Sequence, residues 1–571
     1  MTQRITREID ALERAARRLS RPSDTGRRGP SRSRVGVVLI VVTVAILMLS
    51  LAGLSFVSMM STENKAVHVH TDELQAEHLI GSGAELLGAL LARSPEQRQL
   101  AGGCFDNPEL FRGALVVADD LGGRHGRFSV VSPQIENDEI TAMRFGAADE
   151  SARLNLAVLP LWEQQQAGAA REALLNLPGM TEAIADAILD WIDADPASRQ
   201  FGAEADYYTG LRVPYAPRNA APASIEELML VRGVTRALLM GADANLNYQL
   251  EPAETDAARQ AQGVSLSGAR LTWASYLTVY SAERNVNPQG EPRVDLNEQD
   301  LDALHEKLTA LFNPAWADFV VFYRQYGPYE EAEASGPSDA DAMAPTNESV
   351  PPETPRRVTG VGRGRSAPSL DLSVPAAFEI TSVLDLVGAE VRVANPAAAS
   401  DPSAEPYSLV ENPLDDDPAS VRVYLPELLD HATVDPRKVI RGRVNVNSAP
   451  RAVLAGVPGL DGALVEQIAA ARRRPGARDD AGRRHVTWLL TEGLVDLPKM
   501  KALLPYLTTG GDVFRAQIVG FFDEPAPTAR AELVIDATES PPRQLYYKDL
   551  RLLGVGYPLE ALGAVAPAAR R

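Results

Sequence analysis

Residues 35–60 read VGVVLIVVTVAILMLSLAGLSFVSMM, and the organisation of the whole chain follows from this apolar stretch. No Asp, Glu, Lys or Arg occurs between Arg34 and Glu63. A helix of about 20 apolar residues spans a bilayer, so the stretch is long enough to cross one. Residues 1–36 carry ten arginines and four acidic residues, whereas the whole 571-residue chain has a net charge of −20. This asymmetry predicts a cytoplasmic N-terminus and an exported body.

Three interpretations of the stretch are open. A cleaved secretory signal would have a shorter apolar core and a small-residue cleavage site, and neither is present. An ordinary signal anchor fits both the length and the charge. The third interpretation rests on the junction, where Arg32 and Arg34 precede Gly36 and an unbroken apolar run begins at Val37. This junction resembles that of type IV prepilins, which implies cleavage between Gly36 and Val37.

The helix is expected to continue beyond the apolar stretch. Residues 63–92 are polar, but apolar side chains recur at helical spacing, at Ala76, Ile80, Ala84, Leu87 and Leu91. The first proline after the apolar stretch is Pro95. The sequence therefore predicts one helix over residues 37–92, which crosses the membrane and then lies on a folded domain.

Composition limits what the rest of the chain can be. With 45% hydrophobic residues the chain can bury several cores, and its length predicts two to four folded units after the membrane segment. Its single cysteine, Cys104, cannot form an internal disulfide. A general nucleic-acid binder needs clustered Lys and Arg, so the acidic balance argues against one.

The predicted order of segments alternates strands with helices. Short strand-like pieces at 127–132, 140–145 and 152–156 are expected to begin a sheet, and residues 512–522 with 529–537 to form a C-terminal hairpin, followed by an edge strand at 544–555. The predicted segments are a leader at 1–36, the long helix at 37–92, strands at 93–160, a helical insert at 161–248, strands and a helix at 249–327, a linker at 328–372, a mixed region at 373–447, a second helical copy at 448–508 and a sheet at 509–560.

An internal repeat marks the two helical copies. GRVNVNSAPRAVLAGVPGLDGALVEQIAAARRR at 442–474 repeats ARLNLAVLP joined to LLNLPGMTEAIADAILDW, while PRVDLN at 292–297 repeats the strand part alone. Tight turns at Gly179, Gly233 and Gly459 separate paired apolar helices. This arrangement is similar to a sterile-alpha-motif or helix-hairpin-helix domain.

An acidic stretch in the first copy, DWIDADPASRQFGAEADYY at 190–208, suggests a metal site. Ca²⁺ takes six to eight oxygen ligands in irregular geometry, and a loop can bring several carboxylates together. The spacing here is not that of an EF-hand. A solvated acidic loop is the alternative.

The order DWIDAD, GAEADYY and SIEELMLVRGV, following ADESARLNL, resembles the minor pseudopilin K family of the type II (general) secretion pathway. The resemblance implies an α+β fold, in which a long N-terminal transmembrane helix packs on a pilin-like antiparallel sheet and all-α domains are inserted. It also implies bound Ca²⁺, for which the metal candidates are Asp193, Asp195, Glu204 and Asp206.

The same resemblance implies a non-enzymatic role at the tip of a periplasmic pseudopilus anchored in the inner membrane. The implied partners are other minor pseudopilins, the major pseudopilin, the prepilin peptidase, inner-membrane lipid and secreted proteins; nucleic acid is not expected. Most pilins have Glu as the fifth residue after the cleavage site, and this family lacks it, as the chain does at Val41. The chain departs from the family in its length, its leader, its linker and its second helical copy.

An alternative function is a membrane-anchored DNA-uptake protein. Backbone N–H groups at a helix-hairpin-helix turn can hold phosphates. The first copy carries acids beyond its turn, but the second carries arginines that could attract DNA: Arg472, Arg473, Arg474, Arg478, Arg483 and Arg484. For catalysis the sequence offers neither a nucleophile elbow nor a phosphate loop, so no enzymatic activity is predicted.

Overall fold

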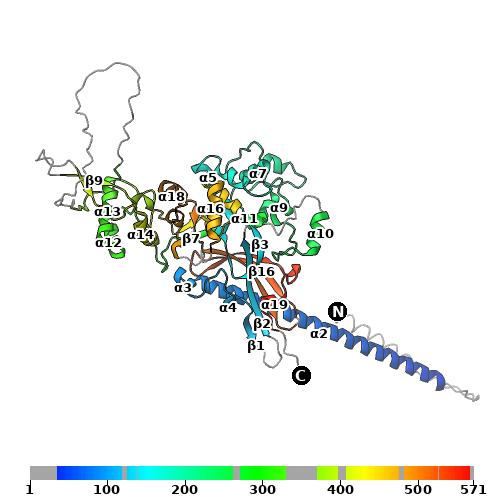
Figure 1. Ribbon diagram of the computed structural model, residues 1–571. Coiled ribbons are helices and arrows are strands. Elements are labelled where there is room, and N and C mark those ends of the chain that lie inside the picture. The colour runs from blue at the N-terminus through cyan, green and yellow to red at the C-terminus, as the bar shows by residue number, and fades with distance from the viewer. Residues whose placement is uncertain are drawn as a thin grey trace, which may run out of the picture. The chain divides into compact units, whose positions relative to one another are not determined.

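The computed structural model describes residues 35–118, 125–136, 138–260, 271–329, 369–395, 407–474, 481–524 and 526–565 (Figure 1). The leader before residue 35, most of the linker at 328–372 and Arg478 lie outside these ranges. The chain divides into two compact parts, the N-terminal part (Met1–Thr71) and the main body (Asp72–Arg571).

One helix, α2 (Val35–Leu91, 57 residues), contains the whole apolar stretch and the polar, periodic segment after it. In the N-terminal part of the chain, the large apolar side chains of α2 are exposed from Val38 to Met60. Within the described residues, Val38–Leu91 is the one helix long and apolar enough to cross a membrane. Exposing so many apolar side chains to water is unfavourable, whereas a helix of this composition is stable in lipid. Helix α2 therefore fits a single-pass membrane anchor.

The main body is built on an antiparallel sheet. Its strand order is β1 (Ala114–Ala118), β2 (His125–Glu136), β15 (Val513–Phe522), β16 (Ala529–Asp536) and β17 (Arg543–Asp549). Strand β3 (Glu139–Phe145) also pairs with β2, and β4 (Ala148–Asp149) with β15. The predicted C-terminal hairpin and edge strand are confirmed. Because β2 pairs directly with β15, the cyan and orange strands of Figure 1 lie side by side although some 380 residues separate them, and everything between β4 and β15 is inserted into one sheet.

The second half of α2 packs on one face of this sheet. Four of the five residues of the predicted stripe are buried there, and Ala84 is partly buried against the same cluster. The buried side chains of α2 meet Phe128 and Val130 of β2 and Ile518 of β15; they are Ala76, Leu79, Ile80, Leu87, Leu90 and Leu91. A Cβ added at Gly520 would lie 2.3 Å from the Ala76 carbonyl oxygen, so a glycine is needed where the helix and β15 approach most closely. A separate core cluster forms where Leu562 of the short helix α19 (Leu559–Leu562) packs with Val131 of β2 and with Val519 and Phe521 of β15.

Three helical units occupy the insertion, each closed by a short parallel strand pair. In unit 1 (residues 154–278), β5 (Leu154–Asn155) pairs with β6 (Leu277–Thr278). In unit 2 (residues 294–433), β8 (Val294–Asp295) pairs with β11 (Ala432–Thr433). In unit 3 (residues 444–508), β13 (Val444–Asn445) pairs with β14 (Leu507–Thr508). The helices lie between the paired strands, as a parallel connection requires.

The three strand pairs share one local structure. In each, an Asn or Asp is opposite a Thr, as Asn155 is opposite Thr278. The side chain of that residue accepts a hydrogen bond from the backbone N–H two residues on, at 2.9 Å in all three units. The repeat therefore occurs three times. The strand predicted at 152–156 belongs to unit 1 and not to the main sheet.

The helices of units 1 and 3 follow the same order. Unit 1 contains α5 (Leu159–Gln165), α6 (Ala169–Leu175), α7 (Glu182–Ile192), α8 (Ala205–Thr209), the 3-10 helix η3 (Ile225–Leu230), α9 (Arg236–Met240), α10 (Pro252–Gln260) and α11 (Trp273–Tyr276). Unit 3 contains α15 (Arg451–Ala455), α16 (Gly462–Arg472), α17 (Trp488–Thr491) and α18 (Leu497–Leu503). Within the segment predicted as strands and a helix at 249–327, residues 273–276 form one helical turn, from which Trp273 and Tyr276 face the core.

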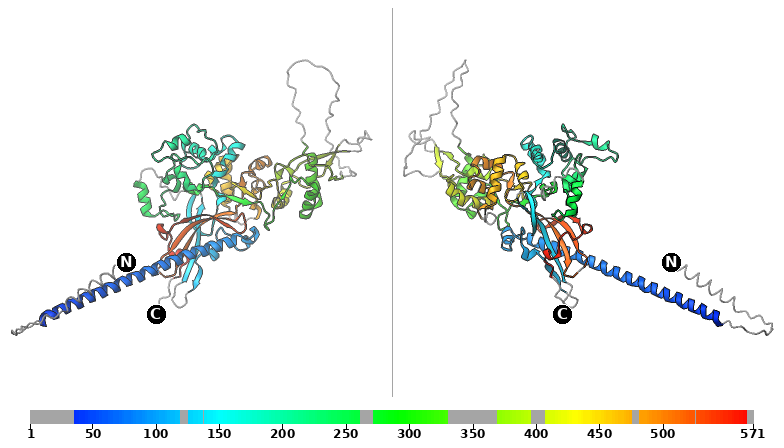
Figure 2. Two further views of the ribbon diagram at one scale, coloured as in Figure 1. Left: turned by 180° about the vertical axis from the view of Figure 1, so that it is seen from behind. Right: turned by 45° about the vertical axis from the view of Figure 1, so that its right-hand side comes forward.

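Unit 2 is the copy that the sequence did not predict. PRVDLN at 292–297 leads into α12 (Leu301–Leu311) and α13 (Pro314–Tyr326), which are separate helices at Pro314 as expected. After the linker the unit resumes with the 3-10 helix η4 (Val383–Leu386) and α14 (Pro418–His431). Between them the hairpin of β9 (Val391–Ala394) and β10 (Tyr407–Val410) adds to unit 2. The three units and the sheet can be followed in both views of Figure 2.

Candidate functional site

The acidic loop of unit 1 begins where α7 ends, and Asp190 is its most buried carboxylate. Asp190 is fully buried and accepts hydrogen bonds from the backbone N–H of Arg199 and from its Nη1 atom, the latter at 2.8 Å. A Cβ at Gly202 would lie 1.8 Å from Asp190 Oδ2, so the loop closes over this carboxylate only because residue 202 is glycine.

Arg199 also forms an ion pair with Asp193, at the C-cap of α7. One guanidinium thus serves two carboxylates, and the Oδ1 atom of Asp193 remains buried without a hydrogen-bond partner. Burial raises the pKa of Asp193, the ion pair with Arg199 lowers it, and the charges of Asp195 and Asp190 raise it. The net direction is upward, so the negative charge at Asp193 is under-compensated.

Glu204 is the second under-compensated carboxylate. It is 7% exposed, and both of its carboxylate oxygens are buried without a hydrogen-bond partner. Burial raises its pKa first, and the charges of Asp190 and Asp193 raise it further. A buried, unpaired carboxylate is unfavourable unless a proton or a cation compensates it.

The other two predicted ligands lie at the surface. Asp195 is exposed, and its Oδ1 accepts a hydrogen bond from the backbone N–H of Ala197 at 2.9 Å. Asp206 is exposed in the first turn of α8. As the described side chains stand, no three His, Cys, Asp or Glu residues are close enough together to hold a metal ion. Asp190 and Arg199, which the prediction omitted, are therefore central to this loop.

The residues fit a cation in part. Orphaned oxygens on Glu204 and Asp193 are hard ligands of the kind that Ca²⁺ prefers. Arg199 supplies the positive charge that an ion would bring to Asp193, so ion binding requires the guanidinium to withdraw from that carboxylate.

The three predicted turn glycines share one structure. Gly179, Gly233 and Gly459 have φ of 74°, 83° and 85°, a left-handed conformation that glycine adopts without strain. Two residues after each glycine comes the N-cap of the next helix: Thr181, Thr235 and Asp461. Each cap side chain accepts a hydrogen bond from a first-turn N–H, so these helix ends are already capped by the chain.

Four of the six arginines that were expected to attract DNA have partners within the described part of the chain. Arg483 and Arg474 form ion pairs with Glu492, at 2.7 and 3.1 Å, and Arg484 pairs with Asp430 at 2.7 Å. Arg472 Nη1 donates to the Ala449 carbonyl at 2.6 Å. These four arginines thus already have acidic or carbonyl partners in the protein, which does not favour a role in holding a DNA backbone.

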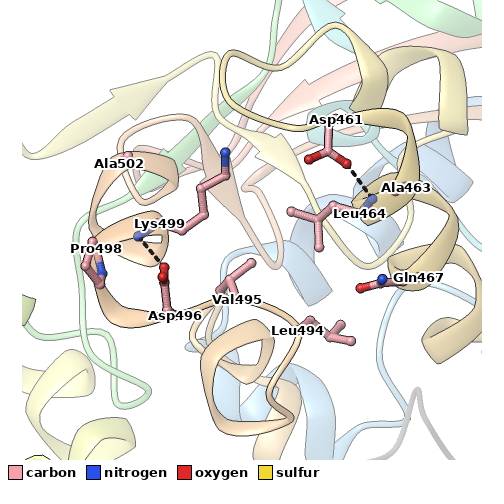
Figure 3. Close-up of a pocket in the computed structure, with 10 residues that line it drawn as sticks. All are labelled: Asp461, Ala463, Leu464, Gln467, Leu494, Val495, Asp496, Pro498, Lys499 and Ala502. Atoms are coloured by element: carbon pink, nitrogen blue, oxygen red, sulfur yellow. Dashed lines mark hydrogen bonds between the residues drawn. The ribbon is translucent and has the colours of Figure 1, made fainter.

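An open pocket of about 630 Å³ lies between α16 and α18 of unit 3 (Figure 3). Asp461 and Asp496 on its rim cap the two helices, at 2.8 Å to Leu464 N and 2.9 Å to Lys499 N. Leu464, Leu494 and Val495 supply apolar lining, and Lys499 also lines the pocket. Both carboxylates thus have structural roles, and the pocket pairs no nucleophile with a base.

A single apolar N-terminal helix, packed in its second half on an antiparallel sheet that carries inserted helical units, confirms the predicted α+β class and fits a single-pass membrane anchor. Residues 152–241, most of unit 1, match the family described as type II secretion system (T2SS), protein K. This matched stretch, 90 of the 571 residues, is therefore similar to protein K of type II secretion systems.

No curated protein matches the chain. One similar solved chain comes from a structure described as the GspK-GspI-GspJ complex from the enterotoxigenic Escherichia coli Type 2 Secretion System. The identity is 11% and the TM-score 0.30, over 85% of this chain and 99% of the other. A likeness of this size carries no argument, so the similarity to protein K rests on residues 152–241 alone.

Proposed function

We propose that the chain is made as a prepilin, cut between Gly36 and Val37, and placed at the tip of the type II secretion pseudopilus. The observation that carries this proposal is α2, one unbroken helix that begins apolar and ends packed on the sheet. Exposed apolar side chains along residues 38–60 suit both lipid and the helices of neighbouring subunits. The function is assembly, and no catalytic step is proposed.

The tip position follows from Val41. Most pilins have Glu at this place and use it for docking in the filament, whereas Val41 carries no charge with which to do so. The chain is therefore suited to an end of the filament. Its proposed partners are other minor pseudopilins and the major pseudopilin, with the prepilin peptidase, inner-membrane lipid and secreted proteins as further contacts.

Calcium is part of the proposal. Glu204 and Asp193 would hold the ion, with Asp195 and Asp206 as the remaining predicted ligands and Asp190 nearby. Bound Ca²⁺ would supply the positive charge that the orphaned oxygens of Glu204 and Asp193 lack. The ion would fix the loop between α7 and α8 in a protein that has one cysteine and no internal disulfide.

The N-terminal sequence of the protein from membranes tests the processing step. We expect it to begin at Val37, and we expect Gly36→Leu to accumulate as the full-length precursor. Gly53→Leu is the matched control, because Gly53 lies in the same helix with open space around it and its substitution leaves the junction intact. An intact Met1 in the wild-type protein would refute the prepilin proposal.

Tip placement is tested separately by site-specific cross-linking in cells that assemble the pseudopilus. Wild-type protein should cross-link to other minor pseudopilins and appear once per filament. Val41→Glu should allow incorporation below the tip and raise the amount of protein K per filament. Equal incorporation of both proteins along the filament would contradict the role proposed for Val41.

The DNA-uptake alternative is not favoured, because the turns of units 1 and 3 are capped and Arg474, Arg483 and Arg484 form ion pairs within the protein. The match of residues 152–241 points to secretion as well.

A further inference from the structure

A second loop of unit 1 carries ligand types in a defined order. Residues 243–254 read DANLNYQLEPAE. The twelve-residue calcium loop of an EF-hand uses positions 1, 3, 5, 7, 9 and 12, with the backbone carbonyl at position 7 and a Glu at position 12. Counted from Asp243, those positions are Asp243, Asn245, Asn247, Gln249, Glu251 and Glu254. The order of acid, amide, amide, carbonyl, acid and acid, rather than the number of acids, points to calcium.

The structure places this loop between two helices. Helix α9 ends at Met240, three residues before position 1, and α10 begins at Pro252, so that Glu254 lies in its first turn. Position 6 is Tyr248, with a φ of 62°, in the left-handed conformation for which calcium loops use glycine. A tyrosine is held there although glycine would be unstrained.

The side chains of the loop turn inward. Asp243 accepts from the backbone N–H groups of Asn247, at 3.1 Å, and Tyr248, at 2.8 Å. Glu254 reaches back across the loop and accepts from Ala244 N at 2.9 Å. The first and last positions of the motif are thus folded toward the same backbone segment.

The carboxylates of this loop lack a cation. Within the described part of the chain, no Lys, Arg or His forms an ion pair with Asp243, Glu251 or Glu254. Two amide groups take that place at Glu251, whose Oε1 accepts from Asn245 Nδ2 and Asn247 Nδ2, each at 3.0 Å. The site is therefore built with excess negative charge.

The loop also joins unit 1 to the main sheet. Gln517 of β15 donates to the Leu246 carbonyl at 2.7 Å, and Arg530 of β16 donates to the carbonyls of Leu246 and Asn245. Asn247 Nδ2 donates to the Gly556 carbonyl at 2.8 Å, and its side chain is 1% exposed. An ion held in the loop would consequently stiffen the contact between unit 1 and the sheet.

We propose that residues 243–254 bind Ca²⁺ as an EF-hand-like loop, and that the ion fastens helical unit 1 to the pilin-like sheet. As they stand, the carboxylates of Asp243, Glu251 and Glu254 are not grouped closely enough to hold a metal ion, so binding requires them to close around it. On binding, Asn245 and Asn247 turn their Nδ2 groups away from Glu251 and present oxygen to the ion. This site is separate from the loop at 190–208, and it does not depend on where in the pseudopilus the subunit is placed.

Terbium luminescence of the full chain in detergent tests the proposal. Tb³⁺ replaces Ca²⁺ at oxygen sites and is sensitised by a nearby tyrosine, here Tyr248. The starting protein carries Asp193→Asn and Glu204→Gln, which removes the other candidate site. We expect Tb³⁺ emission that added Ca²⁺ displaces. Glu254→Gln in this background should weaken binding at least ~10-fold, as loss of a ligand does.

Two controls make the result decisive. Glu306→Gln removes the same charge from an exposed position on α12 and should leave binding unchanged. Tyr248→Phe should reduce the emission while Ca²⁺ binding measured by calorimetry persists. Binding that survives Glu254→Gln, or no displaceable emission in the starting protein, would overturn the proposal. Neither result would bear on processing at Gly36.

Discussion

Glu150 and Arg515 form a buried ion pair, with 2.8 Å between Arg515 Nε and Glu150 Oε1. Glu150 follows β4, where the chain leaves the sheet, and Arg515 lies on β15, where it returns. Arg153 and Glu532 extend the network, at 2.9 Å to Glu150 and 2.6 Å to Arg515. The pair therefore ties together the two ends of the insertion that holds all three helical units.

We predict that Glu150→Gln destabilises the protein by about 3 kcal/mol, because removing one partner leaves a buried charge under-compensated. The free energy of unfolding in urea measures the effect on the main body of the chain, Asp72–Arg571. Glu298→Gln is the matched control: its partner Lys307 is half exposed, so the loss should be about 0–1 kcal/mol. Equal losses in the two variants would show that the buried pair contributes no more than a surface one.

Acid should weaken the same network. Burial would raise the pKa of Glu150, but Arg153 and Arg515 lower it to about 2, below the ordinary value of 4.5. The folded-state pKa is depressed, so the stability it contributes is complete above about pH 4.5 and is lost as the pH falls toward 2. Unfolding free energies measured between pH 6 and pH 2 should fall more steeply for wild type than for Glu150→Gln. Parallel curves would contradict the assignment.

Local sequence patterns predicted the elements whose signals are contiguous. The stripe from Ala76 to Leu91 has helical spacing because it covers one face of α2, and it is buried against the sheet as expected. The three turn glycines were found because each sits between two apolar helices and is needed for a left-handed turn. Short-range physics was enough for both.

Unit 2 could not be found in this way. Its closing pair joins Val294 to Ala432, so the partner strand is more than 130 residues away and the linker interrupts the helices between. At the acidic loop the sequence indicated the carboxylates but not that Arg199 would take two of them. The loop at 243–254 was missed because Tyr248 stands where the familiar pattern has glycine.

The turn of unit 3 offers two glycines with opposite expectations. Gly459→Ala should destabilise by about 1 kcal/mol or more, since φ is 85° and a Cβ would lie 3.3 Å from Leu503. Gly462→Ala should be neutral or stabilise by up to about 1 kcal/mol, because Gly462 is in α16 with open space around it. Thermal unfolding of the two variants should shift in opposite directions. Equal shifts would mean that the turn is not held as described.

Glu204 gives a prediction whose sign depends on calcium. Its folded-state pKa is raised, first by burial and then by Asp190 and Asp193, so its charged form opposes folding at neutral pH and the opposition fades as the pH falls. In a chelator, Glu204→Gln should therefore raise the melting temperature above that of wild type. In saturating Ca²⁺ the order should reverse, because a bound ion stabilises only the protein that keeps its ligands.

Asp206→Asn is the comparison within the same loop. Asp206 is exposed, so the substitution should leave the melting temperature in chelator unchanged, and any smaller rise on adding Ca²⁺ would count it among the ligands. If Glu204→Gln lowers the melting temperature in chelator, its carboxylate is compensated by the protein itself, and the case for an ion at Asp193 and Glu204 fails. If it raises the temperature in chelator and also retains the full rise with Ca²⁺, the loop is strained but the ion binds elsewhere. Only the reversal of order supports calcium as the charge that this buried carboxylate lacks.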